Sequence, residues 1–393
     1  MIYKSIQQTA IRLGVSERSV RRWAIEGKIP GAHKLGRDWL IPAGITGPSS
    51  YVEKDASGIR QLMRVPLPFV RGSFEPGHAL EYIDSLKDED DRNIATGEYY
   101  YFIGKCSKAV DVLDPYLCSP DPALRFTSAL ICFFASFALG RQHLSYLTKD
   151  QLEKQIEEGL NSEAVPELHA LGVLVLNIVY VLMHLPHDNL PLLENHIAYL
   201  PEGLKVLGTY LMAYKAYLRR EYDKALTIAD VTAAMFKDPY PIGMSHIHII
   251  AAVVLMNMKR PEAAKDRFMK AWELLKDDGM IEVVSEHLWI LQGIPDISLK
   301  QLYPKNYNTI MDLSGKHMSA WAKIHSEIMN KEVRVHLSAT EVTIALMYDR
   351  GWSAKEIAIH LNFSQATVRK YIQIIYEKLS IRDKKELREF MLH

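Results

Sequence analysis

Apolar and polar residues between Gly351 and Leu379 follow the 3.6-residue period of an α-helix in two short stretches. In the first stretch one face is apolar and consists of Ile357, Ala358 and Leu361. In the second stretch the apolar face is longer and consists of Val368, Ile372, Ile375 and Leu379. The pattern therefore predicts two amphipathic helices with only a few residues between them.

The residues that precede each stretch favour the same interpretation. Ser353 stands three positions ahead of Glu356, which is the capping-box arrangement at the start of a helix. Asn362-Phe363 is expected to make the turn, and Ser364 is expected to cap the second helix. Two short capped helices joined by a tight turn are typical of a helix-turn-helix unit that reads DNA.

The side chains off the apolar face of the second helix are polar or basic, namely Gln365, Thr367, Arg369, Lys370 and Gln373. We assign base-edge contacts to Arg369, Lys370 and Gln373, because such side chains form hydrogen bonds with bases in the major groove. Ser364 and Thr367 lie at the start of the helix, where backbone amides also point at an anion, and we assign them to DNA phosphates.

Residues 337–387 resemble the LuxR/GerE-type helix-turn-helix domain of bacterial response regulators. The resemblance rests on Leu337-Ser-x-x-Glu341, Lys355-Glu-Ile-Ala358, Thr367-Val-Arg369 and Tyr376-x-Lys-Leu379, with Gly351 and Ser364 at the matching spacing. It implies promoter recognition, and a homodimer on inverted half-sites. The sequence departs from the family at Arg369-Lys370-Tyr371, where Lys-Asn-His is commoner, and at Ser380, where Gly is usual.

A second helix-turn-helix pattern occupies the N-terminus. Ser5 and Gln8 fit a capping box, and Ile6, Ala10 and Leu13 follow on one helical face. In the next predicted helix, Glu17–Glu26, the inward residues are Val20, Trp23 and Ala24, while Arg18, Arg21 and Arg22 point outward. Two short apolar segments around Gly36 then predict a β-hairpin that ends near Pro42.

This N-terminal unit resembles the winged helix-turn-helix of excisionases and MerR-type regulators. The matching residues are Leu13-Gly-Val-Ser16, Gly27-Lys-Ile-Pro30 and Lys34-x-Gly-Arg37-x-Trp39. The resemblance implies a recognition helix in the major groove and a wing, here with Lys34 and Arg37, on the adjacent backbone. Three arginines on one short helix favour DNA contact, and protein docking by the same fold is the alternative.

The middle of the chain is predicted to be helical throughout. Residues 48–77 are rich in Pro, Gly and Ser and are expected to be a linker between a domain at 1–47 and a helical domain at 78–332. Within 78–332, helix pairs are predicted at Ala95–Leu117, Tyr210–Met235 and Ala251–Leu275, and Ala225 and Ala264 are 39 residues apart. These pairs resemble tetratricopeptide-like repeats, which stack into a solenoid whose groove holds a peptide, a protein or a small ligand.

The distribution of charge supports contacts with nucleic acid at the two ends. The 47 basic and 47 acidic side chains cancel over the whole chain. Residues 1–42 nevertheless carry eight Lys and Arg against three Asp and Glu, and residues 331–393 carry eleven against eight. Basic ends around an acidic middle are the distribution expected of a protein that contacts DNA through its terminal domains.

Other features argue against secretion and membrane insertion. Cys106, Cys118 and Cys132 have no metal or redox spacing and indicate reduced cytosolic thiols. Met1-Ile-Tyr-Lys4 leads directly into a polar helix, so no signal peptide is expected. The apolar run Ala170–Met183 is too short to span a bilayer and is interrupted by Asn177, which favours a buried helix of the repeat domain.

The sequence contains no pattern for catalysis or for a cofactor. Phosphate-binding loops, nucleophile elbows and His-Glu-x-x-His helices are absent, and no phosphoacceptor receiver domain is visible. His246 and His248 diverge around a helix, which disfavours a shared metal. The aromatic run Tyr99–Phe102 favours packing, with a role in a binding groove as the alternative.

We therefore predict a mainly all-α protein in which a helical-repeat solenoid, at residues 78–332, is flanked by helix-turn-helix domains at 1–47 and 333–393, the first with a β-hairpin wing. The predicted function is that of a cytoplasmic bacterial transcriptional regulator, not an enzyme, that binds double-stranded DNA and is controlled by an effector in the solenoid groove. A contact with RNA polymerase is compatible with this function. The alternative is a scaffold whose terminal domains dock proteins.

Overall fold

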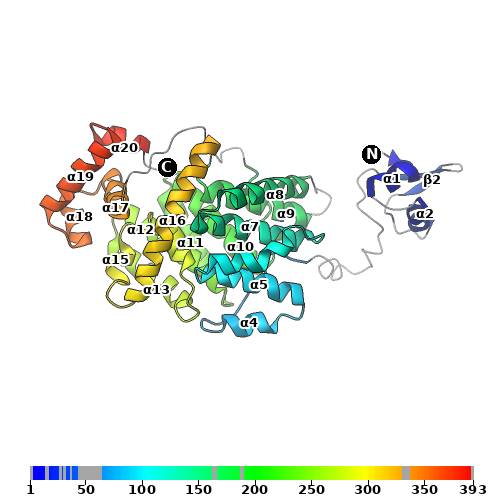
Figure 1. Ribbon diagram of the computed structural model, residues 1–393, viewed down its shortest axis with the longest axis horizontal. Helices are drawn as coiled ribbons and strands as arrows, with labels where there is room; N and C mark the ends of the chain where they lie inside the picture. Colours follow the sequence, from blue (N-terminus) through cyan, green and yellow to red (C-terminus); the bar gives the residue numbers. More distant parts are fainter. Residues whose placement is uncertain are drawn as a thin grey trace. The chain divides into compact units, whose positions relative to one another are not determined.

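The computed structural model describes residues 3–13, 17–25, 29, 32–35, 38–42, 64–161, 166–185, 190–329 and 337–390 (Figure 1). The chain divides into two compact units, Met1–Val65 and Pro66–His393, which we describe separately. The second unit contains both the helical middle and the C-terminal domain.

The N-terminal unit combines two helices with a small antiparallel sheet. Helices α1 (Ile6–Leu13) and α2 (Glu17–Ile25) are followed by strands β2 (His33–Leu35) and β3 (Asp38–Pro42), so both the helix pair and the β-hairpin predicted from the sequence are present. A further strand that the sequence did not predict, β1 (Tyr3–Lys4), pairs with the outer side of β3 and gives the order β1-β3-β2.

The core of this unit is formed by the residues that the helical pattern places inward. Its buried members are Ile6, Ala10, Val20, Ala24, Ile29 and Ile41, with Trp23, Ala32 and Trp39 packed against them. Ser5 and Gln8 form the predicted reciprocal cap, with distances of 3.1 and 3.2 Å between backbone nitrogen and side-chain oxygen. The predicted turn at Gly14–Ser16, the hairpin tip at Gly36 and the side chain of Leu13 lie outside the described residues.

The predicted linker, residues 48–77, extends too far toward the C-terminus. Residues 43–63 lie outside the described part of the chain, but from Pro66 onward the chain belongs to the second unit. Phe69 is completely buried, and the Glu98 carboxylate accepts hydrogen bonds from the Phe69 amide at 2.9 Å and the Val70 amide at 3.4 Å. Prolines at 66, 68 and 76 therefore mark an irregular segment that packs against α5, not a tether.

The helical body, residues 66–329, contains the following elements: α4 (Ala79–Ser85), α5 (Glu89–Phe102), α6 (Cys106–Leu113), η2 (Asp114–Tyr116), α7 (Pro122–Leu139), α8 (Gln142–Leu160), α9 (Pro166–Leu182), η3 (Leu193–Asn195), η4 (Ile197–Tyr199), α10 (Glu202–Leu218), α11 (Tyr222–Met235), α12 (Pro241–Asn257), α13 (Pro261–Leu275), α14 (Glu282–His287), α15 (Ile294–Ser298) and α16 (Pro304–Met329). The predicted helix pairs at 95–117, 210–235 and 251–275 correspond to α5–α6, α10–α11 and α12–α13. The prediction of a helical middle is thus confirmed.

Five helices of the body end in the same kind of turn. The residue with positive φ after α5, α7, α9, α10 and α12 is Gly104, Gly140, His184, Arg220 and Lys259, respectively. In each turn the amide of this residue bonds to the carbonyl three residues earlier, and the next amide bonds to the carbonyl five residues earlier, as at Arg220 and Glu221. This pairing is the Schellman arrangement. The last two of these positions are 39 residues apart, which is the spacing of Ala225 and Ala264.

The last helices of the body fold back onto the earlier ones. Helix α14 contacts α5, α12 and α16, and α16 packs along α7. The Ile281 amide donates to the Phe102 carbonyl at 2.8 Å, and the Tyr99 hydroxyl donates to the Asp278 carbonyl at 3.2 Å. Tyr101 and Phe102 are buried, so the aromatic run at 99–102 serves packing. The chain itself therefore covers part of the inner face that an open solenoid would leave free.

The most apolar helices lie inside the body. Among the described residues one helix, α7, is long and apolar enough to cross a membrane by length and composition, but 72% of it is buried within the protein, as expected of a core helix. The apolar run at 170–183 falls largely in α9, whose residues Val173, Leu174 and Ile178 are also buried. Cys106, Cys118 and Cys132 are free thiols.

Candidate nucleic-acid interface

The C-terminal part of the second unit is a four-helix arrangement built on two capping boxes. Its helices are α17 (Ala339–Asp349), α18 (Ala354–Leu361), α19 (Gln365–Leu379) and α20 (Lys384–Phe390). At the start of α18 the Glu356 amide donates to the Ser353 hydroxyl at 3.2 Å, and the Glu356 carboxylate accepts from the Ser353 amide at 2.6 Å. The predicted capping box is therefore confirmed, and Ser338 and Glu341 form a second one at α17.

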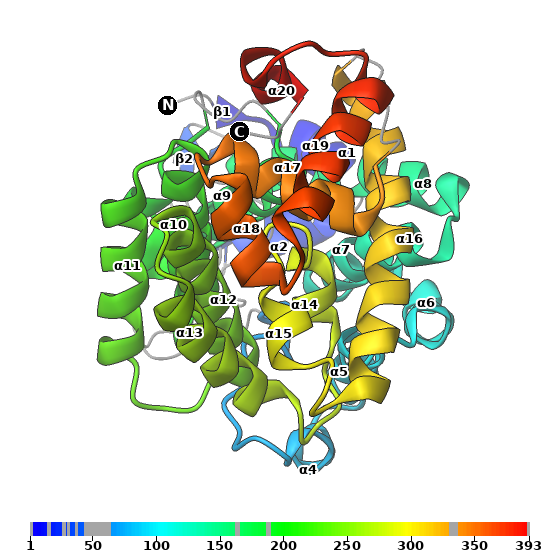
Figure 2. The same ribbon diagram turned by 90° about the vertical axis from the view of Figure 1, so that its left-hand side faces the viewer.

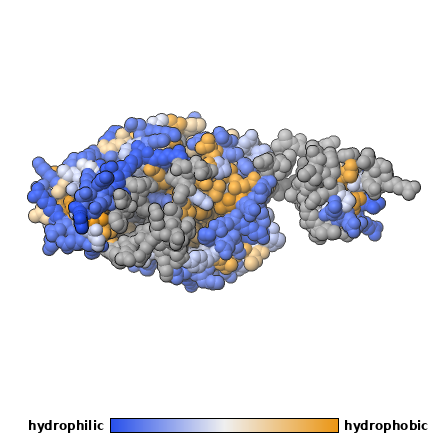
Figure 3. Space-filling view, turned by 90° about the horizontal axis from the view of Figure 1, so that it is seen from above, coloured by the Kyte–Doolittle hydropathy of each residue, from blue (hydrophilic) through white to orange (hydrophobic). Residues whose placement is uncertain are grey.

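Helix α19 is oriented as its sequence pattern predicts. Val368 and Ile375 are buried against the other helices, and Ile372 and Leu379 are half-buried. The opposite face is exposed and carries Gln365, Thr367, Arg369, Lys370 and Gln373. Figure 3 shows that the end of the second unit at which α18–α20 lie is mainly hydrophilic. The face on which we expect DNA contacts is thus open to solvent.

The start of α19 presents hydroxyl and amide groups together. The Ser364 hydroxyl accepts from the Thr367 amide at 3.0 Å, and the two side-chain oxygens of these residues are 2.7 Å apart. The helix dipole and the unpaired amides of the first turn favour an anion at this point. Ser364 and Thr367 are therefore well placed for a phosphate, although the Ser364 hydroxyl already serves as the cap.

The three residues assigned to base edges differ in their present contacts. Arg369 and Lys370 are exposed and form no ion pair with any other residue that the structure describes. The Gln373 amide instead donates to the Glu377 carboxylate at 3.0 Å, one turn further along α19. Arg369 and Lys370 are thus available for a ligand, whereas Gln373 must exchange one hydrogen bond for another.

Two buried carboxylates hold α19 and α20 on α17. The Glu341 carboxylate accepts from the Lys378 ammonium of α19 at 2.8 Å, and the Asp349 carboxylate accepts from the Arg388 guanidinium of α20 at 3.2 Å. Although burial opposes it, the hydrogen bond from Lys378 helps to lower the pKa of Glu341, which keeps the carboxylate charged. The sequence analysis did not single out Asp349. Its signal was an acidic residue at an inward position of an otherwise apolar helix.

The N-terminal unit also exposes a basic helical face. Arg18, Arg21 and Arg22 are all exposed on α2, opposite the buried Val20 and Ala24, and Lys34 is exposed on β2. Arg37, which we assigned to the wing, lies outside the described residues. The structure thus brings the three arginines together on one helix, as predicted.

Comparison with protein families agrees with both sites. Residues 335–391 match the family model described as bacterial regulatory proteins, luxR family, and residues 5–44 match the model described as helix-turn-helix domain. Comparisons with curated proteins and with solved structures found no match. The chain thus carries a LuxR-family helix-turn-helix domain, a DNA-binding type found in regulators of transcription, at its C-terminal end and a second helix-turn-helix domain at its N-terminal end.

Proposed function

We propose that this protein is a bacterial transcriptional regulator that recognises promoter DNA through α19. The observation that carries the proposal is the exposed polar face of α19, on a domain that matches the luxR family model. Arg369, Lys370 and Gln373 read base edges in the major groove, and Ser364 and Thr367 hold phosphates at the start of the helix. Such domains act as dimers on inverted half-sites, so the regulator is a homodimer in the cytoplasm.

The N-terminal domain is the second DNA reader in this proposal. It has the helix pair and the β-hairpin of an excisionase- or MerR-like winged helix-turn-helix. Arg18, Arg21 and Arg22 contact the major groove or its phosphates, and the hairpin residues Lys34 and Arg37 contact the adjacent backbone. Exposed guanidinium groups on one short helix support this assignment, since they suit phosphate and guanine contacts better than an apolar partner.

The helical body is the control element. A pocket of about 710 Å³ lies between the α7–α8 turn and α16, where Phe137, Leu139 and Met311 supply apolar surface and Ser145 and Lys316 supply polar groups. This size falls within the range of small-molecule sites, and it supports control by a small ligand more directly than a solenoid groove does. A ligand controls the protein only through different affinities for two states.

A salt titration of DNA binding tests the proposal. Duplexes are first selected by the full chain from a random-sequence pool, and the logarithm of the binding constant is then measured against the logarithm of salt concentration. We expect a steep decrease, of about 0.9 for each phosphate contact. Selection of no duplex, or a flat dependence, would show that the terminal domains dock proteins and that the chain is a scaffold.

The variant Arg369→Ala tests the assignment of base contacts. It should weaken binding to the selected duplex by about 1–3 kcal/mol more than binding to unrelated duplex, because a bidentate base contact provides discrimination of this size. Lys316→Ala, which removes an exposed lysine of the helical body, is the control and should change neither affinity. Equal losses on both duplexes would identify Arg369 as a phosphate contact.

A further inference from the structure

Two turns of the helical body carry a long basic side chain at a position that favours glycine. Arg220 and Lys259 have φ values of 61° and 56°, at the turns after α10 and α12. The same position is Gly104 after α5 and Gly140 after α7. A side chain in this left-handed conformation is strained, so its retention indicates that Arg220 and Lys259 have a task.

The Lys259 ammonium contacts the C-terminal domain at three points. It donates to the Gly351 carbonyl at 2.8 Å, it lies 3.2 Å from the Glu356 carboxylate, and it is 6.0 Å from the centre of the Trp352 ring. The hydrogen bonds of the Glu356 carboxylate with Ser353 and Lys259 lower the pKa of Glu356 to about 2. Lys259 thereby binds the turn between α17 and α18 and the first turn of α18.

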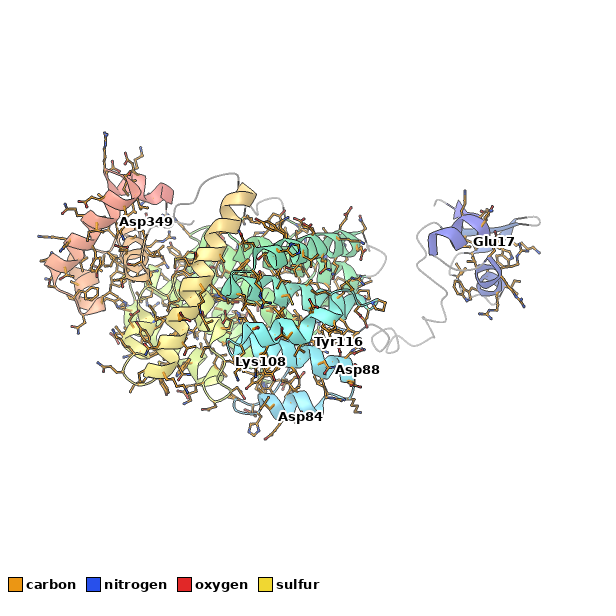
Figure 4. All side chains as sticks on the ribbon, viewed as in Figure 1. Glu17, Asp84, Asp88, Lys108, Tyr116 and Asp349 are labelled. Carbon is orange, nitrogen blue, oxygen red and sulfur yellow. The ribbon has the colours of Figure 1, made fainter. Side chains whose placement is uncertain are left out.

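Arg220 contacts the same domain one turn away. Its guanidinium is 3.6 Å from the Asp349 carboxylate, whose side chain is 0% exposed (Figure 4). The neighbouring Arg350 side chain is only 4% exposed. It lies against the Tyr217 hydroxyl of α10, where its positive charge partly offsets the effect of burial, which raises the pKa of Tyr217. These charges are paired and buried where α10 meets α17, as expected of a packed interface.

A third contact comes from the segment between α14 and α15. The His360 imidazole Nε2 is 3.1 Å from the Gln292 carbonyl, to which it donates. Gly293, with a φ of 84°, faces Leu361, and a Cβ atom at this position would lie 2.4 Å from the Leu361 side chain. The close approach of backbone to side chain thus requires glycine here, in contrast to positions 220 and 259.

All these contacts reach residues 349–361 of the C-terminal domain, which comprise the end of α17, the following turn and α18. Figures 1 and 2 show α17 and α18 beside α12 and α15. The face of α19 that carries Arg369, Lys370 and Gln373 is exposed in the same arrangement. The body therefore holds the domain from behind the helix that reads DNA.

We infer that Arg220, Lys259 and residues 292–293 form a docking seat that holds the LuxR-type domain in place while it reads DNA. This inference rests on the proposed function of α19. The seat fixes the direction in which α19 faces, so a change in the body reorients the reader without covering its DNA-binding face.

The double variant Arg220→Gly with Lys259→Gly tests the seat in the full chain. Glycine removes both side chains and suits the left-handed backbone, so α10 and α12 should keep their fold. We expect amide hydrogen exchange in residues 350–361 to become roughly tenfold faster or more, because a buried ion pair is removed. Exchange in α10 and α12 should stay unchanged or become slower. Lys316→Ala is the matched control and should leave residues 350–361 unaffected.

Unchanged exchange in residues 350–361 of the double variant would overturn the seat. The second measurement uses the wild-type chain with a duplex enriched from a random-sequence pool. Residues 350–361 should stay protected in the complex, whereas faster exchange there on DNA binding would show that docking and reading exclude each other. If no duplex is enriched, the proposed function fails, and the comparison of the variants without DNA still decides whether the seat exists.

Discussion

At the scale of single residues, Asp349 connects three guanidinium groups. Its carboxylate is 3.2 Å from Arg388 and 3.9 Å from Arg350, both in the C-terminal domain, and 3.6 Å from Arg220 of the helical body. A buried carboxylate with several cationic partners is retained because each charge offsets the desolvation of the others. The same argument implies that removal of one member leaves the rest without compensation.

Asp349→Ala should therefore be strongly destabilising. Arg350 is almost fully buried, and without the carboxylate its charge has no counterion, which costs about 3–5 kcal/mol. Urea unfolding of the C-terminal domain measures this loss. Asp312→Ala, which removes an exposed partner of Lys316, is the control and should cost less than about 1 kcal/mol. Equal losses in the two variants would contradict the role of Asp349.

Buried histidines of the body predict a loss of stability in acid. The Nδ1–H of His287 donates to the Val283 carbonyl at 2.7 Å, and its Nε2 accepts from the Tyr210 hydroxyl at 2.6 Å. Burial lowers the pKa of His287 to about 3 and that of His246 to about 4. The unfolded chain binds these protons near pH 6.5, so the free energy of unfolding should decrease as the pH falls below 6.5, by up to about 1.4 kcal/mol per pH unit for each histidine.

The variant His287→Gln isolates this contribution. Glu286 acts in the opposite direction, because burial raises its pKa to about 7 and the folded state holds its proton more tightly. The difference between wild type and variant is therefore more informative than the slope of either alone. Urea midpoints at several pH values from 7 to 5 should show a shallower loss in the variant, and parallel curves would contradict the assignment.

At the scale of elements, the sequence predicted what local interactions determine. The caps at Ser5, Ser353 and Ser364 follow from residues at most three positions apart, and each forms as expected. Strand β1 was missed because its partner is β3, almost 40 residues later. The packing of residues 66–77 was missed for the same reason, since the partner of Phe69 is Glu98.

The docking seat shows the same limit. The equal spacing of Ala225 and Ala264 made the turns after α10 and α12 predictable as equivalent positions. Nothing in the local pattern indicates that Arg220 and Lys259 reach residues 349–361, because this depends on how the last helices fold back along the body. The face of α19 could be predicted in full, since one helical period defines it.

Helix α19 ends in a residue that is open to improvement. Ser380 has a φ of 56° where related domains usually have glycine. Ser380→Gly relieves this strain and should stabilise the domain by roughly 1 kcal/mol. Asn362→Gly, at the end of α18 with a φ of 55°, should gain less, because asparagine tolerates this conformation. Thermal unfolding of both variants measures the difference, and a destabilised Ser380→Gly would contradict this account.

At the scale of the whole molecule, the net charge of zero conceals two basic ends and an acidic middle. The exposed arginines of α2 and the exposed basic residues of α19 lie in different compact units. In our proposal both units bind the same DNA, so their phosphate contacts add to one salt dependence, whereas a protein-docking N-terminal unit would add nothing to it.

The triple variant Arg18→Ala, Arg21→Ala and Arg22→Ala separates these two roles. These side chains are exposed on α2, and the core residues Val20 and Ala24 remain, so the fold of the N-terminal unit should persist. If the arginines bind phosphates, the slope of the logarithm of the binding constant against that of salt concentration should become shallower by about 0.9 for each phosphate that is no longer neutralised. Filter binding of the full chain to a long selected duplex measures this slope. An unchanged slope, with an unchanged footprint, would assign the N-terminal unit to a protein partner and leave α19 as the DNA reader.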